Sequence, residues 1–357
     1  MGLKDQQLAL KWIKENIKSF GGDSNRITIF GESAGGASAH YHILSPGSNG
    51  LFNRAILQSG TAFCPWASNN NHRKFAIEAG REFGCFIDNG TEKYLECMQN
   101  VNPRYLILAA EKTNIMGFSP YYVLPGVDGE FIDEAPEILM KKRKYNKVDI
   151  IQGITRDDGG LDLMYDYLYP TRREKINKEF EKLGILSLYL QKETNSTQLA
   201  RRVYQYYLLR ENITVTKKDE KKLLEMTTDS MFKVPNDIVA NMFAADPDIK
   251  LYTYQLDHEG QISFMGLIPG FNRTDIITHS DDLVYLFYGS GGFLRKLENQ
   301  DDLKVREIFL DLWTNFAKTG NPTPSGSDFI WKEATPNNFQ YLSLTTSPVM
   351  KKDDFQK

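Results

Sequence analysis

The sequence predicts an α/β fold with a mostly parallel sheet flanked by helices. Short runs rich in β-branched and aromatic residues alternate with longer segments of helical spacing, which is typical of parallel strands joined by helical crossovers. Hydrophobic residues make up 41% of the 357 residues, enough for a sizeable core. The sequence contains no internal repeat and no low-complexity linker, so we interpret residues 1–357 as one domain.

The first third of the chain begins with a predicted amphipathic helix over residues 3–20. Its apolar residues recur at helical spacing, and they are Leu10, Ile13, Ile17 and Phe20. A short strand is predicted at Ile27–Phe30, and a helix rich in small residues follows at Ala34–Leu44. A second buried strand is predicted within residues 52–60, and residues 72–112 are predicted to be mostly helical.

The remaining two thirds repeat this alternation. A third strand is predicted at Val148–Ile154, and a charged helical region over residues 170–245 is interrupted near Asn195 and Asn212. A fourth strand is predicted at Leu251–Leu256. A last helix is predicted at Val305–Ala317, with one apolar face formed by Ile308, Phe309, Leu312 and Phe316.

The stretch Gly31-x-Ser33-x-Gly35 joins the first predicted strand to the helix that follows it. A serine on so sharp a turn is held in strained backbone geometry, and flanking glycines prevent side-chain clashes. Its Oγ would be exposed at a helix N-terminus, where the free N–H groups favour developing negative charge. We therefore predict Ser33 as a nucleophile and the Ala34 N–H as one donor to an oxyanion. A glycine-rich turn without chemistry is the alternative.

The sequence offers five histidines as the base. His40 and His42 follow Ser33 on the same predicted helix, about 10 to 14 Å along its axis and too far to meet Oγ. His72 and His258 lack a suitable setting. His279 lies in a polar loop after the fourth predicted strand, from which a side chain can reach back over the sheet. We predict His279 as the base, with a surface-loop histidine as the alternative.

The acid is predicted at Asp158, which follows the third strand and precedes two glycines. Its neighbour Asp157 is the alternative. Ser33, Asp158 and His279 then follow the chain order nucleophile, acid, histidine. In this scheme Ser33 attacks a carbonyl and forms an acyl-enzyme, His279 transfers the proton to the leaving alcohol, and Asp158 fixes the histidine tautomer.

Composition and motifs exclude several other functions. The net charge of −3 gives no indication of a nucleic-acid or anionic-membrane partner. The basic run Lys141–Lys144 is interpreted as a solvated helix end, with a targeting signal as the alternative. No apolar run approaches the length of a membrane span, and the N-terminus has no signal-peptide core.

Metal and cofactor chemistry is not predicted. The sequence has no Cys-x-x-Cys and no His-Glu-x-x-His motif, so we expect neither a metal nor a cofactor. The glycine-rich stretch Gly289–Gly292 does not match a dinucleotide-binding loop, and we interpret it as a flexible turn.

Short motifs along the whole chain match those of one known family. They are Gly2–Gln6, Phe20–Asp23, Thr28–Gly36, Ala55–Gly60, Val127–Gly129, Thr228–Asp229, His279–Leu283 and Trp313–Pro322. Together they resemble the type-B carboxylesterase/cholinesterase family of α/β-hydrolases, and most closely its insect carboxylesterases. The resemblance implies the α/β-hydrolase fold, small carboxylic esters as substrates, Ser33 as nucleophile and His279 as base.

The same resemblance implies that the acid lies at Asp158, where the family usually has Glu. Because the Asp side chain is shorter by one C–C bond, about 1.5 Å, we expect its contact to His279 to be loose or to require a backbone shift. Ser59 matches a family position that supports the acid, and a buried serine at a strand end is the alternative.

Further family features map onto this sequence. The resemblance implies a disulfide between Cys85 and Cys97, an acyl pocket that includes Trp66, and an unpaired Cys64. Four sequons, which begin at Asn89, Asn195, Asn212 and Asn272, are candidates for glycosylation. For a full-length form we therefore expect secretion or residence in the endoplasmic-reticulum lumen. The oligomeric state is not predicted.

The largest departure from the family concerns the segment upstream of the equivalent of Met1. Family members carry roughly the first half of the sheet there, including a His-Gly-Gly stretch whose N–H groups complete the oxyanion hole. Without those strands, we expect the Ile27–Phe30 strand to be an exposed, apolar, aggregation-prone sheet edge. The alternatives to an active esterase are an inactive cholinesterase-like adhesion or binding protein and a non-functional fragment.

Overall fold

The computed structural model describes residues 1–69, 72–112, 123–268, 271, 273, 275–287 and 296–352. Within them, one six-stranded sheet has its strands in chain order from β1 to β6. The strands are β1 Thr28–Glu32, β2 Arg54–Gln58, β3 Asp149–Thr155, β4 Leu251–Leu256, β5 Gln340–Leu344 and β6 Val349–Lys352. The first five strands pair in parallel, and β6 is antiparallel to β5. The predicted α/β class with a mostly parallel sheet is therefore confirmed.

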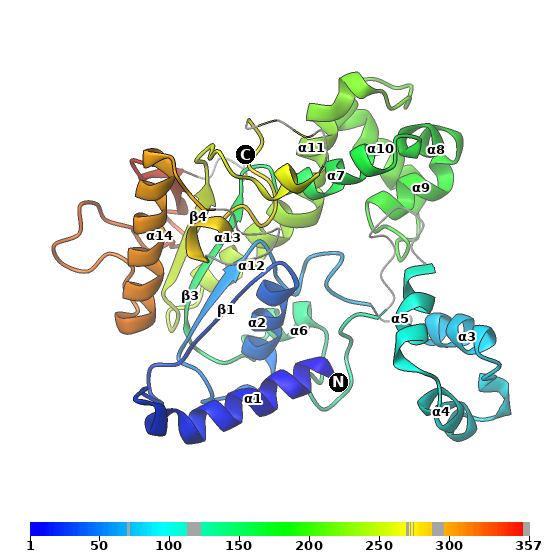
Figure 1. Ribbon diagram of the computed structural model, residues 1–357, viewed down its shortest axis with the longest axis horizontal. Coiled ribbons are helices and arrows are strands. Elements are labelled where there is room, and N and C mark those ends of the chain that lie inside the picture. The colour runs from blue at the N-terminus through cyan, green and yellow to red at the C-terminus, as the bar shows by residue number, and fades with distance from the viewer. Residues whose placement is uncertain are drawn as a thin grey trace.

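Strand alternation divides the core between the two faces of the sheet. Ala55 and Leu57 of β2 pack on one face, while Ile56 packs on the other, as the period of two along a strand requires. The first face is covered by α2 (Ala34–Leu44), α6 (Pro136–Lys141) and α12 (Val234–Ala244), and the second by α13 (Leu283–Leu286) and α14 (Gln300–Thr319). Figure 1 shows α14 on the opposite side of the sheet from α2 and α6.

The first helix matches its predicted bounds but not all of its predicted packing. It consists of α1 (Gly2–Asn16) and the 3₁₀ turn η1 (Ile17–Phe20), and Figure 1 shows α1 crossing one end of the molecule beside α2. Leu10 is buried in the core, whereas Phe20 is 69% exposed. The apolar face that we predicted therefore faces inward only in part.

The helical character predicted for residues 72–112 is confirmed. Residues 72–112 form three helices and a 3₁₀ turn, which are α3 His72–Glu82, η3 Ile87–Asn89, α4 Thr91–Gln99 and α5 Pro103–Lys112. In Figure 1 these helices lie to one side of the sheet. A disulfide joins Cys85, just before η3, to Cys97 in α4, as the family resemblance implied.

The charged region over residues 170–245 is helical with breaks near Asn195 and Asn212, as predicted. The helix α7 Gly160–Leu168 precedes this region, whose first elements are α8 Arg172–Lys178, α9 Phe180–Ser187 and α10 Ser196–Leu208. They are followed by η4 Lys217–Asp219, α11 Glu220–Thr228 and the π-helical turn η5 Asp229–Lys233, which leads into α12. Two further 3₁₀ turns are η2 Pro46–Ser48 and η6 Phe264–Leu267.

Three features differ from the prediction or lie outside it. The hairpin of β5 and β6 was not predicted, because polar residues such as Gln340 and Ser343 interrupt its apolar pattern. The last helix begins earlier than predicted, where the Asn299 side chain caps it by accepting a hydrogen bond from the Asp301 N–H at 2.9 Å. The turn Gly289–Gly292 lies outside the described residues.

The surface agrees with two further predictions. In the described sheet, β1 is an edge strand and its Phe30 is 49% exposed, so the predicted apolar edge is present. In the basic run, Lys142 and Lys144 at the end of α6 form exposed ion pairs with Glu134 and Asp133, as expected of a solvated helix end. None of the helices in the described ranges is long and apolar enough to cross a membrane.

Candidate active site

The turn between β1 and α2 holds Ser33 in a strained conformation. Its backbone has φ 59° and ψ −120°, a region that non-glycine residues rarely occupy. Two backbone hydrogen bonds fix the turn, from the Ser33 N–H to Gln58 O at 2.8 Å and from the Ala37 N–H to Ser33 O at 3.0 Å. Ser33 therefore lies at the carboxyl end of a sheet strand and at the start of a helix, as the glycine-serine-glycine pattern predicted.

Glycines allow the backbone segments around Ser33 to approach closely. The predicted glycines were Gly31 and Gly35, whereas the close approaches occur at Gly31 and Gly60. A Cβ atom on Gly31 would lie 2.4 Å from the backbone carbon of Gly35, and one on Gly60 would lie 2.0 Å from Ser33 O. A Cβ atom on Gly35 would meet nothing within 4 Å among the described residues. The predicted steric role is therefore confirmed for Gly31 and wrong for Gly35, and Gly60 was missed.

His279 and Asp158 lie together at the adjacent strand ends. His279 Nδ1 is 2.8 Å from Asp158 Oδ1, and the other carboxylate oxygen accepts the Thr155 N–H at 3.1 Å. Asp158 is fully buried and His279 is 3% exposed. The contact has normal length, so the shorter Asp side chain does not leave it loose.

Asp157, the alternative acid, contacts other groups. Its Oδ2 accepts hydrogen bonds from Arg156 Nε and from the Ile277 N–H, both at 3.0 Å. Asp157 also forms a β-bridge with Thr278, the residue before His279. Asp157 thus anchors the loop that carries His279, while Asp158 is the carboxylate that contacts His279 Nδ1.

The other histidines are engaged elsewhere. His40 is fully buried and accepts the Ala62 N–H at 3.1 Å, and burial lowers its pKa to about 3. His42 contacts Ser48 Oγ at 2.9 Å, and burial lowers its pKa to about 4. His258 Nε2 is 2.7 Å from Asp302, and His72 is exposed at the start of α3. The structure therefore gives each of them a setting away from Ser33.

Ser33 and His279 line one cavity of about 470 Å³. The other described lining residues are Ala34, Trp66, Val123, Leu124, Leu161, Asp162, Tyr189, Met231, Phe232, Phe264 and Ser280. The π-helical turn η5 contributes Met231 and Phe232 to this lining. Trp66 Nε1 donates a hydrogen bond to Met231 O at 3.1 Å, and the Phe232 ring lies 4.6 Å from the His279 ring. The cavity is mainly apolar and can hold the hydrocarbon part of a small molecule.

A second acidic group, which the sequence reasoning missed, faces the imidazole. Glu32 Oε1 lies 3.1 Å from His279 Nε2 and accepts a hydrogen bond from Ser280 Oγ at 2.8 Å. Burial alone would lower the pKa of His279, but Glu32 and the hydrogen bond to Asp158 outweigh burial and raise it to about 9. Burial raises the pKa of Glu32. The sequence feature that could have identified Glu32 is its position directly before Ser33, at the end of β1.

The structure does not support the role predicted for Ser59, but it confirms the unpaired Cys64. Ser59 is fully buried with φ 49°, but its Oγ has no hydrogen-bond partner among the described residues, so it gives Asp158 no hydrogen bond. Cys64 is a buried thiol outside any disulfide, as the resemblance implied. Burial raises the pKa of Cys64 to about 12, so it is protonated at neutral pH.

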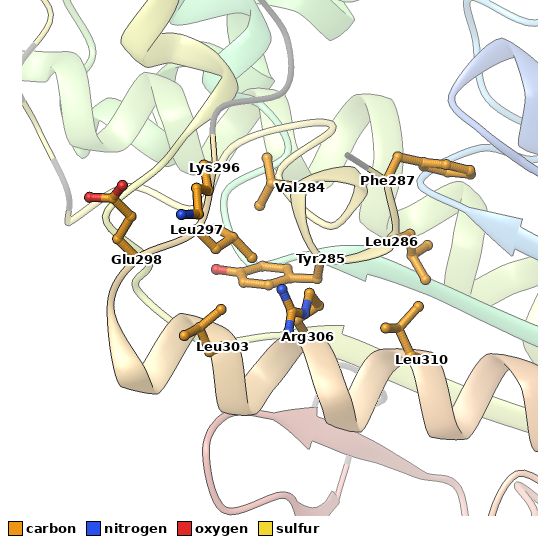
Figure 2. Close-up of a pocket in the computed structure, with 10 residues that line it drawn as sticks. All are labelled: Val284, Tyr285, Leu286, Phe287, Lys296, Leu297, Glu298, Leu303, Arg306 and Leu310. Atoms are coloured by element: carbon orange, nitrogen blue, oxygen red, sulfur yellow. The ribbon is translucent and has the colours of Figure 1, made fainter. Parts of the chain in front are cut away.

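A second cavity, of about 760 Å³, lies between α13, the segment 296–298 and α14. Figure 2 shows the Tyr285 ring above α14, with Arg306 pointing up toward it and Lys296 and Glu298 to one side. Its described lining residues include no Ser, Cys or His. The predicted nucleophile and base, Ser33 and His279, line the other cavity.

Other candidate sites were also located. In the described ranges, no group of three or more His, Cys, Asp or Glu side chains is arranged to hold a metal ion. The sequon asparagines Asn89, Asn195 and Asn212 are exposed, and Asn272 lies outside the described residues.

The carboxylesterase family profile matches residues 1–357, and the chain belongs to this family. Venom carboxylesterase-6 of Apis mellifera is 30% identical over 96% of this chain and 62% of its own length. Bile salt-activated lipase of Bos taurus is 33% identical over 96% of this chain and 57% of its own length. Esterase E4 of Myzus persicae is 30% identical over 96% of this chain and 63% of its own length. The chain thus spans less than two thirds of each of these relatives.

Proposed function

We propose that the protein is a serine carboxylesterase that hydrolyses small carboxylic esters through an acyl-enzyme intermediate. The observation that carries the proposal is the 2.8 Å contact between Asp158 and His279 beside a cavity that Ser33 also lines. Family membership and the strained backbone of Ser33 add support. No feature of the described residues favours the alternative of an inactive binding protein.

In the proposed reaction, Ser33 Oγ attacks the ester carbonyl and His279 Nε2 takes the serine proton. The Ala34 N–H, at the start of α2 where the first N–H groups lack intrahelical acceptors, donates to the oxyanion. Collapse of the tetrahedral intermediate breaks the ester C–O bond, and His279 gives its proton to the leaving alcohol. A water molecule, activated by the same imidazole, then releases the carboxylic acid.

Asp158 supports this cycle by accepting the Nδ1–H of His279. In the neutral imidazole, that hydrogen bond keeps the proton on Nδ1 and leaves the lone pair of Nε2 available to the serine proton. The carboxylate then stabilises the imidazolium that forms. Trp66 would contact the acyl part of the ester, since it lines the same cavity as Ser33 and Ala34.

We also propose that the protein follows the secretory route. A disulfide such as Cys85–Cys97 persists in oxidising compartments, and three sequon asparagines are exposed to a glycosyltransferase. Expression in secretory cells should give a form whose mass falls on treatment with an N-glycosidase. An unchanged mass would remove the support from the sequons.

The proposal is tested with Ser33→Ala and a matched serine control. Ser38 lies on the same helix, and its hydroxyl bonds to the Ala34 carbonyl at 2.7 Å. Hydrolysis of a short-chain naphthyl ester and labelling by an organophosphate should disappear in Ser33→Ala and persist in Ser38→Ala. Labelling retained in Ser33→Ala would contradict the assignment, and absence of both activities in the unaltered protein would favour the inactive alternative.

A further inference from the structure

We propose that Asp162 determines substrate specificity by accepting a hydrogen bond from a neutral hydroxyl group carried by the ester. This inference rests on the proposed esterase function. The preferred substrates would then be esters that carry a hydroxyl group, such as partial esters of polyols or esters of hydroxy acids. Esters whose acyl and alcohol parts are unsubstituted hydrocarbon chains would be poorer substrates.

Asp162 is the one carboxylate among the described residues that line the cavity at Ser33. It lies on α7, and its side chain is 27% exposed. The neighbouring lining residues Leu161, Met231 and Phe232 are apolar. A carboxylate in an apolar wall costs free energy unless its oxygens have donors, so a ligand that offers a donor at this point is favoured over one that does not.

The charge of Asp162 is balanced from behind the cavity wall. Arg172, whose side chain is 8% exposed, donates to Asp162 Oδ1 at 2.6 Å and to Asp166 Oδ1 at 2.9 Å. Asp166 also pairs with Arg173 at 2.7 Å. Two arginines therefore neutralise two aspartates, and the cavity is not a strong attractor for a cation.

One oxygen of the Asp162 carboxylate remains available to a ligand. Arg172 bonds Oδ1, and Oδ2 makes no hydrogen bond with the described residues. Because Asp162 lines the mainly apolar cavity and Arg172 balances its charge, its second oxygen is an acceptor for a hydroxyl O–H. Because the charge of Asp162 is balanced, the site favours a neutral hydroxyl group over a cationic ammonium group.

The position of Asp162 links this acceptor to the reaction centre. Asp162 is the third residue of α7, which begins at Gly160, and it lines the same cavity as Ser33 and His279. The turn that carries the proposed acid leads through Gly159 into α7, so the chain links Asp162 to Asp158 over a few residues. An ester that fills this cavity while its carbonyl meets Ser33 can therefore present a hydroxyl to Asp162.

The experiment compares kcat/KM for matched esters with and without a hydroxyl. One pair is the butyrate monoester of ethylene glycol against propyl butyrate, and the other is the ethyl ester of ω-hydroxyhexanoic acid against ethyl hexanoate. We expect a preference for the hydroxylated member of at least one pair of about 10- to 100-fold, the range of a hydrogen bond to a charged group. Asp162→Leu should remove or reverse that preference.

Two control variants separate specificity from loss of structure. Asp166→Asn removes the other aspartate partner of Arg172 but does not alter the lining of the cavity, so it should keep the hydroxyl preference. The paired variant Asp162→Leu/Arg172→Leu avoids leaving Arg172 without its Asp162 partner, and it should lose the preference as Asp162→Leu does.

Each outcome decides the matter. Equal kcat/KM within both pairs for the unaltered protein, or a preference that survives in the paired variant, would overturn the inference. A preference for butyrylcholine over both neutral butyrates would overturn it in favour of charge recognition. These results differ from failure of the esterase proposal itself, in which propyl butyrate is not hydrolysed and Ser33 is not labelled by an organophosphate.

Discussion

Replacing Asp158 by Asn should disable the base while leaving the shape of the site intact. The carboxylate accepts two donors, His279 Nδ1 at 2.8 Å and the Thr155 N–H at 3.1 Å. An amide has only one acceptor oxygen, and the backbone N–H of Thr155 cannot change its role. The amide oxygen would therefore bond Thr155, and its NH₂ group would face the imidazole.

That arrangement forces the histidine into the wrong tautomer. Nδ1 must then accept a hydrogen bond, so the proton moves to Nε2, which can no longer take the proton of Ser33. Loss of the correct tautomer in a serine triad lowers kcat by about 10⁴-fold, which corresponds to ~5.5 kcal/mol of transition-state stabilisation. The stability cost is smaller, about 1–3 kcal/mol, because hydrogen bonds to a buried carboxylate are replaced by weaker ones to a neutral amide.

The assay is the hydrolysis of a short-chain naphthyl ester at saturating substrate, with thermal unfolding measured in parallel. Asp157→Asn is the matched control, since Asp157 bonds Arg156 and Ile277 and does not contact the imidazole. We expect its kcat to stay within about tenfold of the unaltered value. A kcat for Asp158→Asn within tenfold of the unaltered value, or a loss in Asp157→Asn equal to that in Asp158→Asn, would refute the reasoning.

Two more predictions concern the turn and the imidazole. Gly31→Ala would place a Cβ atom 2.4 Å from the Gly35 backbone and should lower the free energy of unfolding by about 2 kcal/mol or more. Gly35→Ala adds a Cβ atom that meets nothing within 4 Å among the described residues, so it should change the free energy of unfolding by less than about 1 kcal/mol. Equal effects of the two variants in chemical denaturation would contradict this account. Glu32→Gln removes a negative charge 3.1 Å from His279 Nε2, so the pKa of His279 should fall from about 9. Because the neutral imidazole is the active base, the acid limb of the kcat/KM profile should move to lower pH, and an unchanged limb would show that Glu32 does not control the titration of His279.

The chain order of motifs was sufficient to predict Ser33, Asp158 and His279 as a group. Ser33 directly follows β1, Asp158 lies shortly after β3, and His279 lies in the region between β4 and α13. The carboxyl ends of parallel strands lie along one edge of the sheet. The adjacent Asp157 could not be excluded from sequence, because which of two neighbouring carboxylates points inward depends on the backbone of the turn. The structure resolves this through the bonds of Asp157 to Ile277 and Arg156.

Residues that act across the fold were missed for a different reason. The contact of Ser280 with Glu32 joins residues 248 positions apart, and no local pattern announces it. Gly60 is required by the approach of a separate strand end to Ser33. Asp162 follows Asp158 closely in the sequence, but whether its side chain lines the cavity depends on how α7 packs.

The measurement that tests the central claim most directly is the site of organophosphate labelling, determined by mass spectrometry of peptides from the labelled protein. The account predicts one adduct, on the peptide that contains Ser33, formed more slowly in Asp158→Asn at the same pH. An adduct on another residue, or none in a correctly folded protein, would contradict the assignment of Ser33 as the nucleophile.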